Sequence, residues 1–281
     1  CDRRQRQMCI RDRMITIYTI AGSAVYAAEI PVSDQDQLIT SRDWTEISNL
    51  QDEMKKEEPD ATIDYDKALK VYVDCNLIKL QTADTKKLTS ALESVNYVWV
   101  IPFKMEKTYG MFTVAKGLPL REEAKSVLTK AEQEEVKNHA GKWMITETAE
   151  HTVEPYYDIL LEKREALSDC TRVVLVGSQP GMRQPVALGM DDETARIWIS
   201  LGYQYPVMEK IPETQNVESG VYSFDSVAEI SDTYIEDSEV STGAGVQSRS
   251  SMKYVAGIGI IVIGSILILS VLKKKKLEDY E

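Results

Sequence analysis

Cysteine and histidine are scarce in this sequence, which has 4 Cys and 2 His among 281 residues. So few cysteines exclude a disulfide-dense scaffold. The two histidines do not occur in an H-E-x-x-H or H-x-H spacing, so no metal-ligand motif is present. None of the five asparagines begins an N-x-Ser/Thr sequon. A cell-surface protein of this composition is more typical of a bacterial envelope than of a eukaryotic one.

An excess of basic residues is also lacking. The chain has 33 Lys plus Arg against 45 Asp plus Glu, a formal net charge of −12. Binding to nucleic acid requires a basic face that neutralises phosphates, and the sequence contains no such concentration of lysine and arginine outside its two ends. We therefore expect no nucleic-acid partner.

One long apolar run stands out, YVAGIGIIVIGSILILSVL at residues 254–272. A helix of this length covers about 28 Å, enough to cross the hydrocarbon core of a bilayer. The alternative, a buried core helix, normally has a polar edge and is not followed by a run of lysines. Here Lys273, Lys274, Lys275 and Lys276 follow at once. By the positive-inside rule they predict a cytoplasmic tail, residues 273–281, and an extracytoplasmic location for the preceding chain.

The N-terminal region matches an export signal. Residues 14–27 form a short apolar stretch that ends on small residues, and Val25 and Ala27 fit the small-x-small rule for cleavage after Ala27. An uncleaved anchor or a buried strand is the alternative, but the run is short for a membrane span. We interpret residues 1–13, CDRRQRQMCIRDR, as a non-native read-through that precedes this signal remnant.

The exported region is strongly acidic and has two parts. Between residues 28 and 272 there are 24 basic and 40 acidic side chains. Residues 213–253 are rich in Ser, Thr, Gly and acids, so we expect a disordered stalk between a folded domain, residues 28–212, and the membrane. Only Cys75 and Cys170 lie in that domain. They are either a disulfide pair, which the extracytoplasmic location permits, or two separate buried thiols.

Strand and helix patterns alternate through the folded region. Helices are expected at 43–57, after Asp84, from Pro119 to Gly141, and after Pro155. Strands are expected around 69–75, 96–103, 109–117, 142–148, 172–178, 185–190 and 195–200, with Pro102 suggesting a sheet edge. Hairpins dominate the connections. The prediction is an α+β fold with helices on a mostly antiparallel sheet, possibly in two β-α-β-β halves, followed by the transmembrane helix.

Few residues qualify for chemistry. His139 is expected to interact with a helix C-terminus, and His151 lies near several glutamates, which is compatible with a metal or a catalytic base. Asp191, Asp192 and Glu193 are expected to form a solvated turn, because no calcium-loop pattern surrounds them. Eight aromatic residues serve either as core packing or as a ligand groove: Tyr97, Trp99, Trp143, Tyr156, Tyr157, Trp198, Tyr203 and Tyr205.

The leading hypothesis is a single-pass bacterial envelope protein whose acidic extracytoplasmic domain binds a protein or glycan without catalysis. Two alternatives remain open. One is an extracytoplasmic hydrolase that uses carboxylates or His151, and the other is an accessory subunit of a membrane complex. No cofactor or metal site is predicted, and no family resemblance supports any of these functions.

The predicted topology can be tested with protease added to intact cells that express the full chain. The domain and the stalk should be digested, while an epitope placed after Glu281 stays protected because it lies in the cytoplasm. Opening the membrane with detergent should expose the epitope as well. Protection of the whole chain in intact cells would reverse the orientation.

Overall fold

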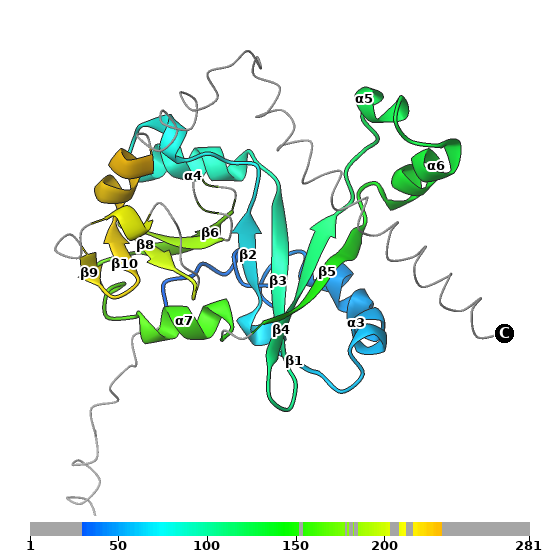
Figure 1. The fold of residues 1–281 in the computed structure, drawn as a ribbon, viewed down its shortest axis with the longest axis horizontal. Coiled ribbons are helices and arrows are strands. Elements are labelled where there is room, and N and C mark those ends of the chain that lie inside the picture. Colours follow the sequence, from blue (N-terminus) through cyan, green and yellow to red (C-terminus); the bar gives the residue numbers. More distant parts are fainter. Residues whose placement is uncertain are drawn as a thin grey trace, which may run out of the picture.

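The computed structural model describes residues 30–151, 154–177, 179, 182, 185–202, 208–211 and 216–231. Ten strands form one sheet in the order β5-β4-β3-β2-β6-β7-β8-β10-β9, and the short β1 pairs with β3 beside this path (Figure 1). The strands are β1 (Thr62–Ile63), β2 (Leu69–Tyr72), β3 (Tyr97–Lys104), β4 (Tyr109–Lys116), β5 (Trp143–His151), β6 (Arg172–Val176), β7 (Val186–Met190), β8 (Ala195–Ser200), β9 (Asn216–Glu218) and β10 (Val221–Ser223).

Every described strand pair is antiparallel except one. β2 and β6 are parallel, and they are paired at Val71–Leu175 and Tyr72–Val176. The sheet therefore consists of two antiparallel halves that meet along β2 and β6, and we call this boundary the junction. The predicted α+β class with a mostly antiparallel sheet is confirmed. The halves are divided differently from the expected repeat, because β5 pairs along its length with β4 and so closes the first half.

The helices are short, and all except the two between β4 and β5 lie against the sheet. They are α2 (Trp44–Ile47), α3 (Gln51–Glu57), α4 (Thr85–Glu93), α5 (Glu122–Lys125), α6 (Lys130–His139) and α7 (Tyr156–Glu162), with 3-10 turns η1 (Ser48–Leu50), η2 (Tyr65–Lys67), η3 (Ile78–Leu80) and η4 (Met208–Lys210). α4 begins where the sequence predicts, because the Asp84 side chain accepts the N–H of Lys87 at 3.0 Å. Leu88 and Leu92, one turn apart, form its buried face.

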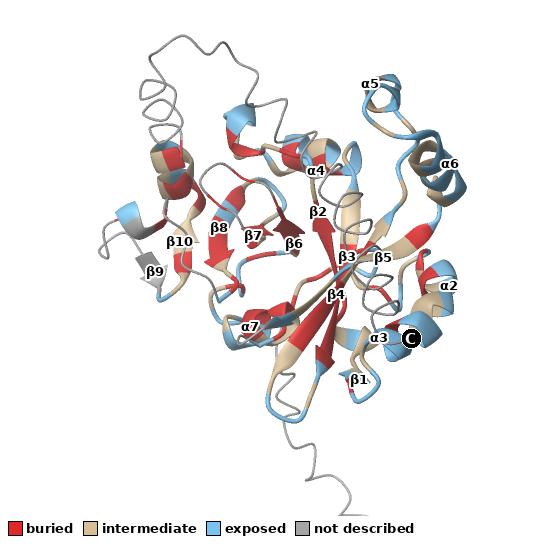
Figure 2. Ribbon diagram, turned by 45° about the vertical axis from the view of Figure 1, so that its right-hand side comes forward, coloured by how far each residue is buried: buried red, intermediate tan, exposed pale blue. Residues whose placement is uncertain are grey.

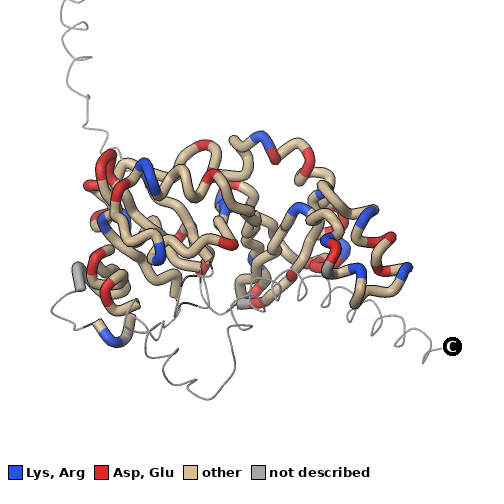
Figure 3. Tube along the Cα trace, turned by 90° about the horizontal axis from the view of Figure 1, so that it is seen from above, with Lys and Arg blue, Asp and Glu red and all other residues tan. Residues whose placement is uncertain are grey.

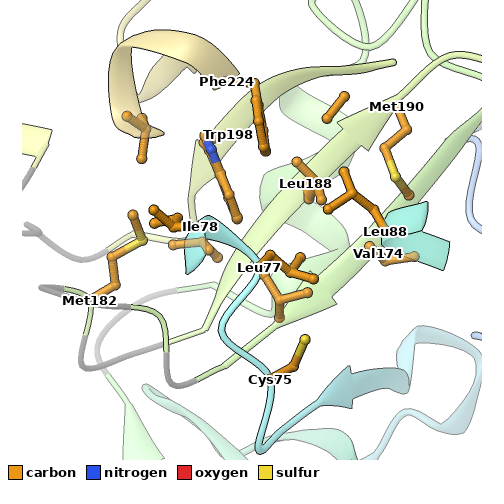
Figure 4. Packing of buried hydrophobic residues seen from close by; sticks show 14 of the residues in the cluster. Cys75, Leu77, Ile78, Leu88, Val174, Met182, Leu188, Met190, Trp198 and Phe224 are labelled. Carbon is orange, nitrogen blue, oxygen red and sulfur yellow. The ribbon is translucent and has the colours of Figure 1, made fainter. Parts of the chain in front are cut away.

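The core consists of three clusters on the two faces of the sheet. The first lies under α4, η3 and the helical segment 224–231, where the rings of Trp198 and Phe224 stack with centroids 5.6 Å apart (Figure 4). The third lies on the same face under α2 and α3, and it contains Trp99 and Phe103. The second cluster fills the opposite face under α7. Because both faces are covered around the junction, its strands are buried along their length (Figure 2).

Two local expectations are corrected. Pro102 lies inside β3, opposite Met111 of β4. On the other side of β3, the pairing with β2 reaches Val100 and the pairing with β1 starts at Phe103, so Pro102 lies between the two. Its carbonyl accepts the N–H of Asp64 at 2.9 Å, so the proline omits one bond on the β1 side and leaves the β2 pairing intact. The single helix expected between Pro119 and Gly141 is two helices, because Thr129 forms a capping box with Glu132 and starts α6 afresh.

The predicted stalk begins too early. β9, β10 and the helical segment 224–231 fall inside residues 213–253, and Val221, Phe224 and Val227 are buried in the core. Apolar residues spaced three apart thus fold a segment whose average composition is typical of disorder. The remainder of the predicted stalk, from residue 232, lies outside the described residues, as do the signal remnant and residues 1–13.

Within the described residues, no helix has the length and apolar character that a bilayer crossing requires. The predicted span at 254–272 and the tail with Lys273, Lys274, Lys275 and Lys276 lie outside these residues. Both therefore stay predictions.

A close approach in the first half of the sheet gives a stability test. A Cβ at Gly110 would lie 2.1 Å from Cζ of Phe103, which is buried against Phe112. Gly110→Ala should therefore lower the free energy of unfolding by about 1–3 kcal/mol through overpacking. In a Phe103→Leu background the additional loss should be smaller, because the facing ring is gone.

Gly177→Ala is the matched control for this measurement by chemical denaturation. A Cβ there would meet its nearest neighbour, the Tyr72 carbonyl oxygen, at an ordinary 3.6 Å. Its effect should stay within about 0.5 kcal/mol. Equal losses at Gly110 and Gly177 would contradict the packing argument.

Candidate functional site

Ionisable and aromatic side chains gather at the junction, on the face shared by the first and third clusters. The N-terminal segment, residues 30–43, crosses the junction there: the Val173 N–H donates to the Pro31 carbonyl at 2.7 Å, and the Leu38 N–H donates to the Ala68 carbonyl at 3.1 Å. The segment thus pairs with both halves of the sheet. We call the side chains around it the junction cluster: Asp36, Asp43, Lys70, Tyr72, Tyr97, Trp99 and Arg172.

Asp36 is the centre of this cluster, and it is 2 % exposed. Its carboxylate accepts hydrogen bonds from Ser33 Oγ at 2.6 Å and from Tyr72 Oη at 2.7 Å. It also pairs with Lys70 Nζ at 3.4 Å, from β2, and with Arg172 Nη2 at 3.0 Å, from β6. One side chain of the N-terminal segment therefore carries an ion pair to each half of the sheet.

Lys70 lies in an aromatic enclosure. Its Nζ donates to the Gln35 carbonyl and lies 4.8 Å from the ring centroid of Tyr97 and 5.2 Å from that of Trp99. These rings offer their negative faces to the ammonium group, which partly replaces the water it has lost. The next acid of the segment, Asp43, accepts hydrogen bonds from Tyr97 Oη at 2.8 Å and Trp99 Nε1 at 3.1 Å, and so fixes both rings.

The pKa values follow from this arrangement. Burial by itself would raise the pKa of Asp36, but hydrogen bonds from Ser33 and Tyr72 and the charges of Lys70 and Arg172 hold it below its ordinary value. Burial lowers the pKa of Lys70, against the pull of Asp36. Burial, and then the negative charge of Asp36, raises the pKa of Tyr72, so the phenol keeps the proton that it donates.

Perturbed pKa values of this kind occur in active sites and in structural ion-pair networks alike. The two best-formed cavities in the described structure, of about 280 Å³ and about 120 Å³, are lined by neither Asp36 nor Lys70. The first lies between η3 and the helical segment 224–231, and the second lies beside β1 and α7. Both are smaller than a typical small-molecule site. The junction cluster therefore fits a structural cross-link better than a reaction site.

A different feature presents surface to solvent. Between β4 and β5 the chain leaves the sheet as a helical hairpin, residues 117–142, which we call the arm (Figures 1 and 2). No residue of α6 is buried. Val127 is 72 % exposed, the highest value among the large apolar residues of the described structure, and Leu118 is 38 % exposed.

The arm keeps its shape by polar contacts of its own. Gln133 Nε2 donates to the carbonyls of Lys125 and Leu128 at 3.0 and 2.9 Å, which joins α5 to α6. At the base, the Gly117 N–H donates to Lys142 and the Gly141 N–H donates to Gly117, both at 2.8 Å. Gly117 is required there, because a Cβ would lie 2.1 Å from the carbonyl oxygen of His139. The arm is thus an ordered projection with a tight neck.

The structure places the two predicted cysteines apart. Cys75 belongs to the first cluster and Cys170 to the second, on opposite faces of the sheet, and both thiols are free. The disulfide that was considered is therefore not formed, and the alternative of two separate buried thiols describes the structure. Burial raises the pKa of both thiols, that of Cys170 to about 11, which keeps them protonated and unreactive.

The two histidines end different elements. His139 is the last residue of α6, at the base of the arm, as its predicted position at a helix end requires. His151 is the last residue of β5 and pairs in register with Tyr109. Among the described residues, no group of three or more His, Cys, Asp and Glu side chains could hold a metal ion.

Asp191, Asp192 and Glu193 form the predicted turn between β7 and β8. Asp191 Oδ1 accepts the N–H groups of Glu193 and Thr194 at 2.8 and 2.6 Å. Of the eight aromatic candidates, Trp99, Trp143, Tyr156 and Trp198 are buried, and Tyr97 and Tyr157 are partly buried. Tyr203 and Tyr205 lie outside the described residues. The six described aromatics therefore pack the core and do not line an open groove.

Sequence reasoning missed the junction cluster. The alternation of Leu69, Val71 and Val73 implies that Lys70 faces solvent, whereas the N-terminal segment covers that face too. The available signal was a lysine in the middle of an apolar strand that needs a buried acid as its partner. Comparison with known protein families, with curated proteins and with solved structures finds no match to this chain.

The cross-linking role of Asp36 predicts a pH-dependent loss of stability. Asp36→Asn leaves Lys70 and Arg172 without their counterion, so the free energy of unfolding at pH 7 should fall by about 3–5 kcal/mol. Because the folded pKa of Asp36 is lowered, its ionisation stabilises the fold above the unfolded pKa of about 3.9, and this contribution is lost as pH falls through the folded pKa.

The difference between the wild type and the variant should therefore shrink below about pH 4, as measured by urea denaturation at a series of pH values. Asp34→Asn is the control, because Asp34 is exposed and two residues away. A difference that is small at pH 7, or that does not change with pH, would show that Asp36 is not the cross-link.

Proposed function

We propose that this chain is a single-pass envelope protein whose acidic extracytoplasmic domain binds another protein without catalysis, and that the arm is its contact element. The observation that carries the proposal is the arm itself. It is a projection held by its own hydrogen bonds, its helix α6 has no buried residue, and it presents Val127 and Leu118 to solvent. An element ordered by its own hydrogen bonds needs little further ordering when a partner binds.

The surface properties of the arm support a protein partner. Residues 117–142 contain five basic and five acidic side chains, whereas residues 28–272 contain 24 basic and 40 acidic ones. The arm is therefore an electrically neutral element on an acidic domain. Figure 3 shows acidic and basic positions interspersed along the described chain, including the arm. A projection with no net charge meets less electrostatic repulsion from another acidic surface than the rest of the domain does.

A glycan ligand is supported less well. Sugar-binding sites stack aromatic side chains on the ligand in an open groove, and the six described aromatic candidates are engaged in packing. The membrane location, stalk and orientation belong to the same proposal, and they rest on residues 232–281 of the sequence. The alternative of an accessory subunit of a membrane complex agrees with this proposal, because such a subunit also binds another protein.

Photo-crosslinking in the full-length protein tests the role of the arm. A photoreactive benzophenone amino acid at Val127 should give a discrete adduct of higher mass when membranes of the native host are irradiated, because the arm tip is then in contact with its partner. The adduct is detected by immunoblotting and identified by mass spectrometry.

The control position is Leu161 on α7, which is apolar and 38 % exposed but lies away from the arm. Random collisions are equally frequent at both positions, so only a specific contact raises the yield at Val127. Leu161 should therefore give at most about one-tenth of the adduct. No adduct at Val127, or the same adducts at both positions, would overturn the proposal.

A further inference from the structure

The strand that follows the arm forms an open edge of the sheet. β5 is the first strand in the sheet order and pairs with β4 alone. Among the described residues, no backbone group pairs with the outer side of β5. Alternate residues of an edge strand point their N–H and C=O groups away from the sheet, and these groups require partners. In the described structure the other edge is β9, with three residues, whereas β5 has nine.

This edge is preformed. β4 and β5 are paired from Tyr109–His151 to Lys116–Trp143, with one irregularity at Thr146, whose Oγ donates to the Thr113 carbonyl at 3.0 Å. On the α3 side, Thr148 Oγ donates to Glu57 Oε2 at 2.5 Å. β5 therefore presents its unpaired backbone groups from a fixed template, which is the arrangement that an added strand uses.

The side chains of β5 indicate which strand would be added. Glu147 and Glu150 are exposed, and they point to opposite faces of the sheet once the irregularity at Thr146 has been passed. Met144, Ile145 and Ala149 are partly exposed along the same edge. An extended segment with apolar and basic side chains would cover Met144, Ile145 and Ala149 with the former and pair with the two glutamates through the latter.

A second copy of this chain is a poor occupant of the edge. Self-pairing would bring two strands that each carry Glu147 and Glu150 against one another, and like charges across strands are destabilising. It would also bring together two acidic regions, because residues 28–272 of each copy contain 40 acidic and 24 basic side chains. The charge pattern instead favours a segment that carries lysine or arginine, from a different protein.

The arm lies at the Trp143 end of this edge, because its neck leads directly into β5. Figure 1 shows α5 and α6 beyond the upper ends of β4 and β5. A segment paired along β5 therefore runs toward the arm. The edge and the arm are therefore neighbours at the Trp143 end of β5.

We infer that the partner bound by the arm adds a basic, extended segment to the sheet along β5, so that recognition combines backbone pairing with Glu147 and Glu150. This inference rests on the proposed function and specifies the chemistry of the partner. It accounts for the length of β5, for its open outer side and for the placement of exposed acids on that strand.

The test extends the crosslinking experiment with the full-length protein that carries the photoreactive group at Val127. Glu147→Lys/Glu150→Lys should reduce the yield of the Val127 adduct by about tenfold, because two ion pairs become repulsions. Glu93→Lys/Glu162→Lys is the matched control, with the same change in charge at exposed positions on α4 and α7. It should leave the yield within about twofold, since its charges lie outside β5 and the arm.

A strand-specific readout uses a defined probe. A 12-residue peptide, selected from a phage-displayed library on the detergent-solubilised full-length protein and bearing basic residues, should slow amide hydrogen exchange at alternate residues of β5 by about tenfold. Protection that is absent from β5, or an adduct at Val127 that survives the β5 substitutions, would overturn the inference. In the second case the arm would still bind a partner, so the proposed function would stand. Loss of the adduct in the unsubstituted protein would overturn both.

Discussion

The carboxylate of Asp36 is the contact on which the architecture depends. The two halves of the sheet share a short parallel pairing between β2 and β6, and much of the rest of their connection passes through the N-terminal segment. Asp36 pairs with Lys70 of one half and Arg172 of the other. The buried carboxylate has two cations and two hydroxyl donors as partners, and its removal would leave both cations without a counterion in a medium of low dielectric. The position of the Asp36 side chain and its ionised state therefore depend on the same contacts.

This central rigidity explains how distant surface elements can be presented in a constant geometry. Helices and loops cover both faces of the sheet at the junction. β5 and the arm lie at one end of the sheet, where many side chains are exposed or partly exposed. The buried centre supplies stability, and the exposed end supplies backbone groups, carboxylates and an apolar tip. Such a division is common in binding domains, because the contact surface is then free to vary without loss of the fold.

Local patterns in the sequence predicted most of the elements, and long-range contacts decided the rest. Strand alternation, the Asp84 cap and Pro155 just before α7 identified their elements, since each signal lies within a few residues. The junction could not be predicted, because Asp36 and Arg172 are 136 residues apart and each is unremarkable alone. The capping box of Thr129 and Glu132 was readable and was overlooked. Residues 216–231 fold because their few apolar side chains meet a core that local composition does not reveal.

The course of the N-terminal segment has a kinetic consequence. Each half of the sheet is built from hairpins, whose contacts are local, so it can form early during folding. The segment can dock only after β6 has formed, because Val173 of β6 donates its N–H to the Pro31 carbonyl. Among the described residues, the ion pair between Asp36 and Arg172 closes the longest loop that any ion pair spans. Residues 30–43 are therefore expected to dock after both halves of the sheet have formed. Until then the edges of β2 and β6 are open, and the interval before closure is when the domain is most exposed to chaperones, proteases and aggregation.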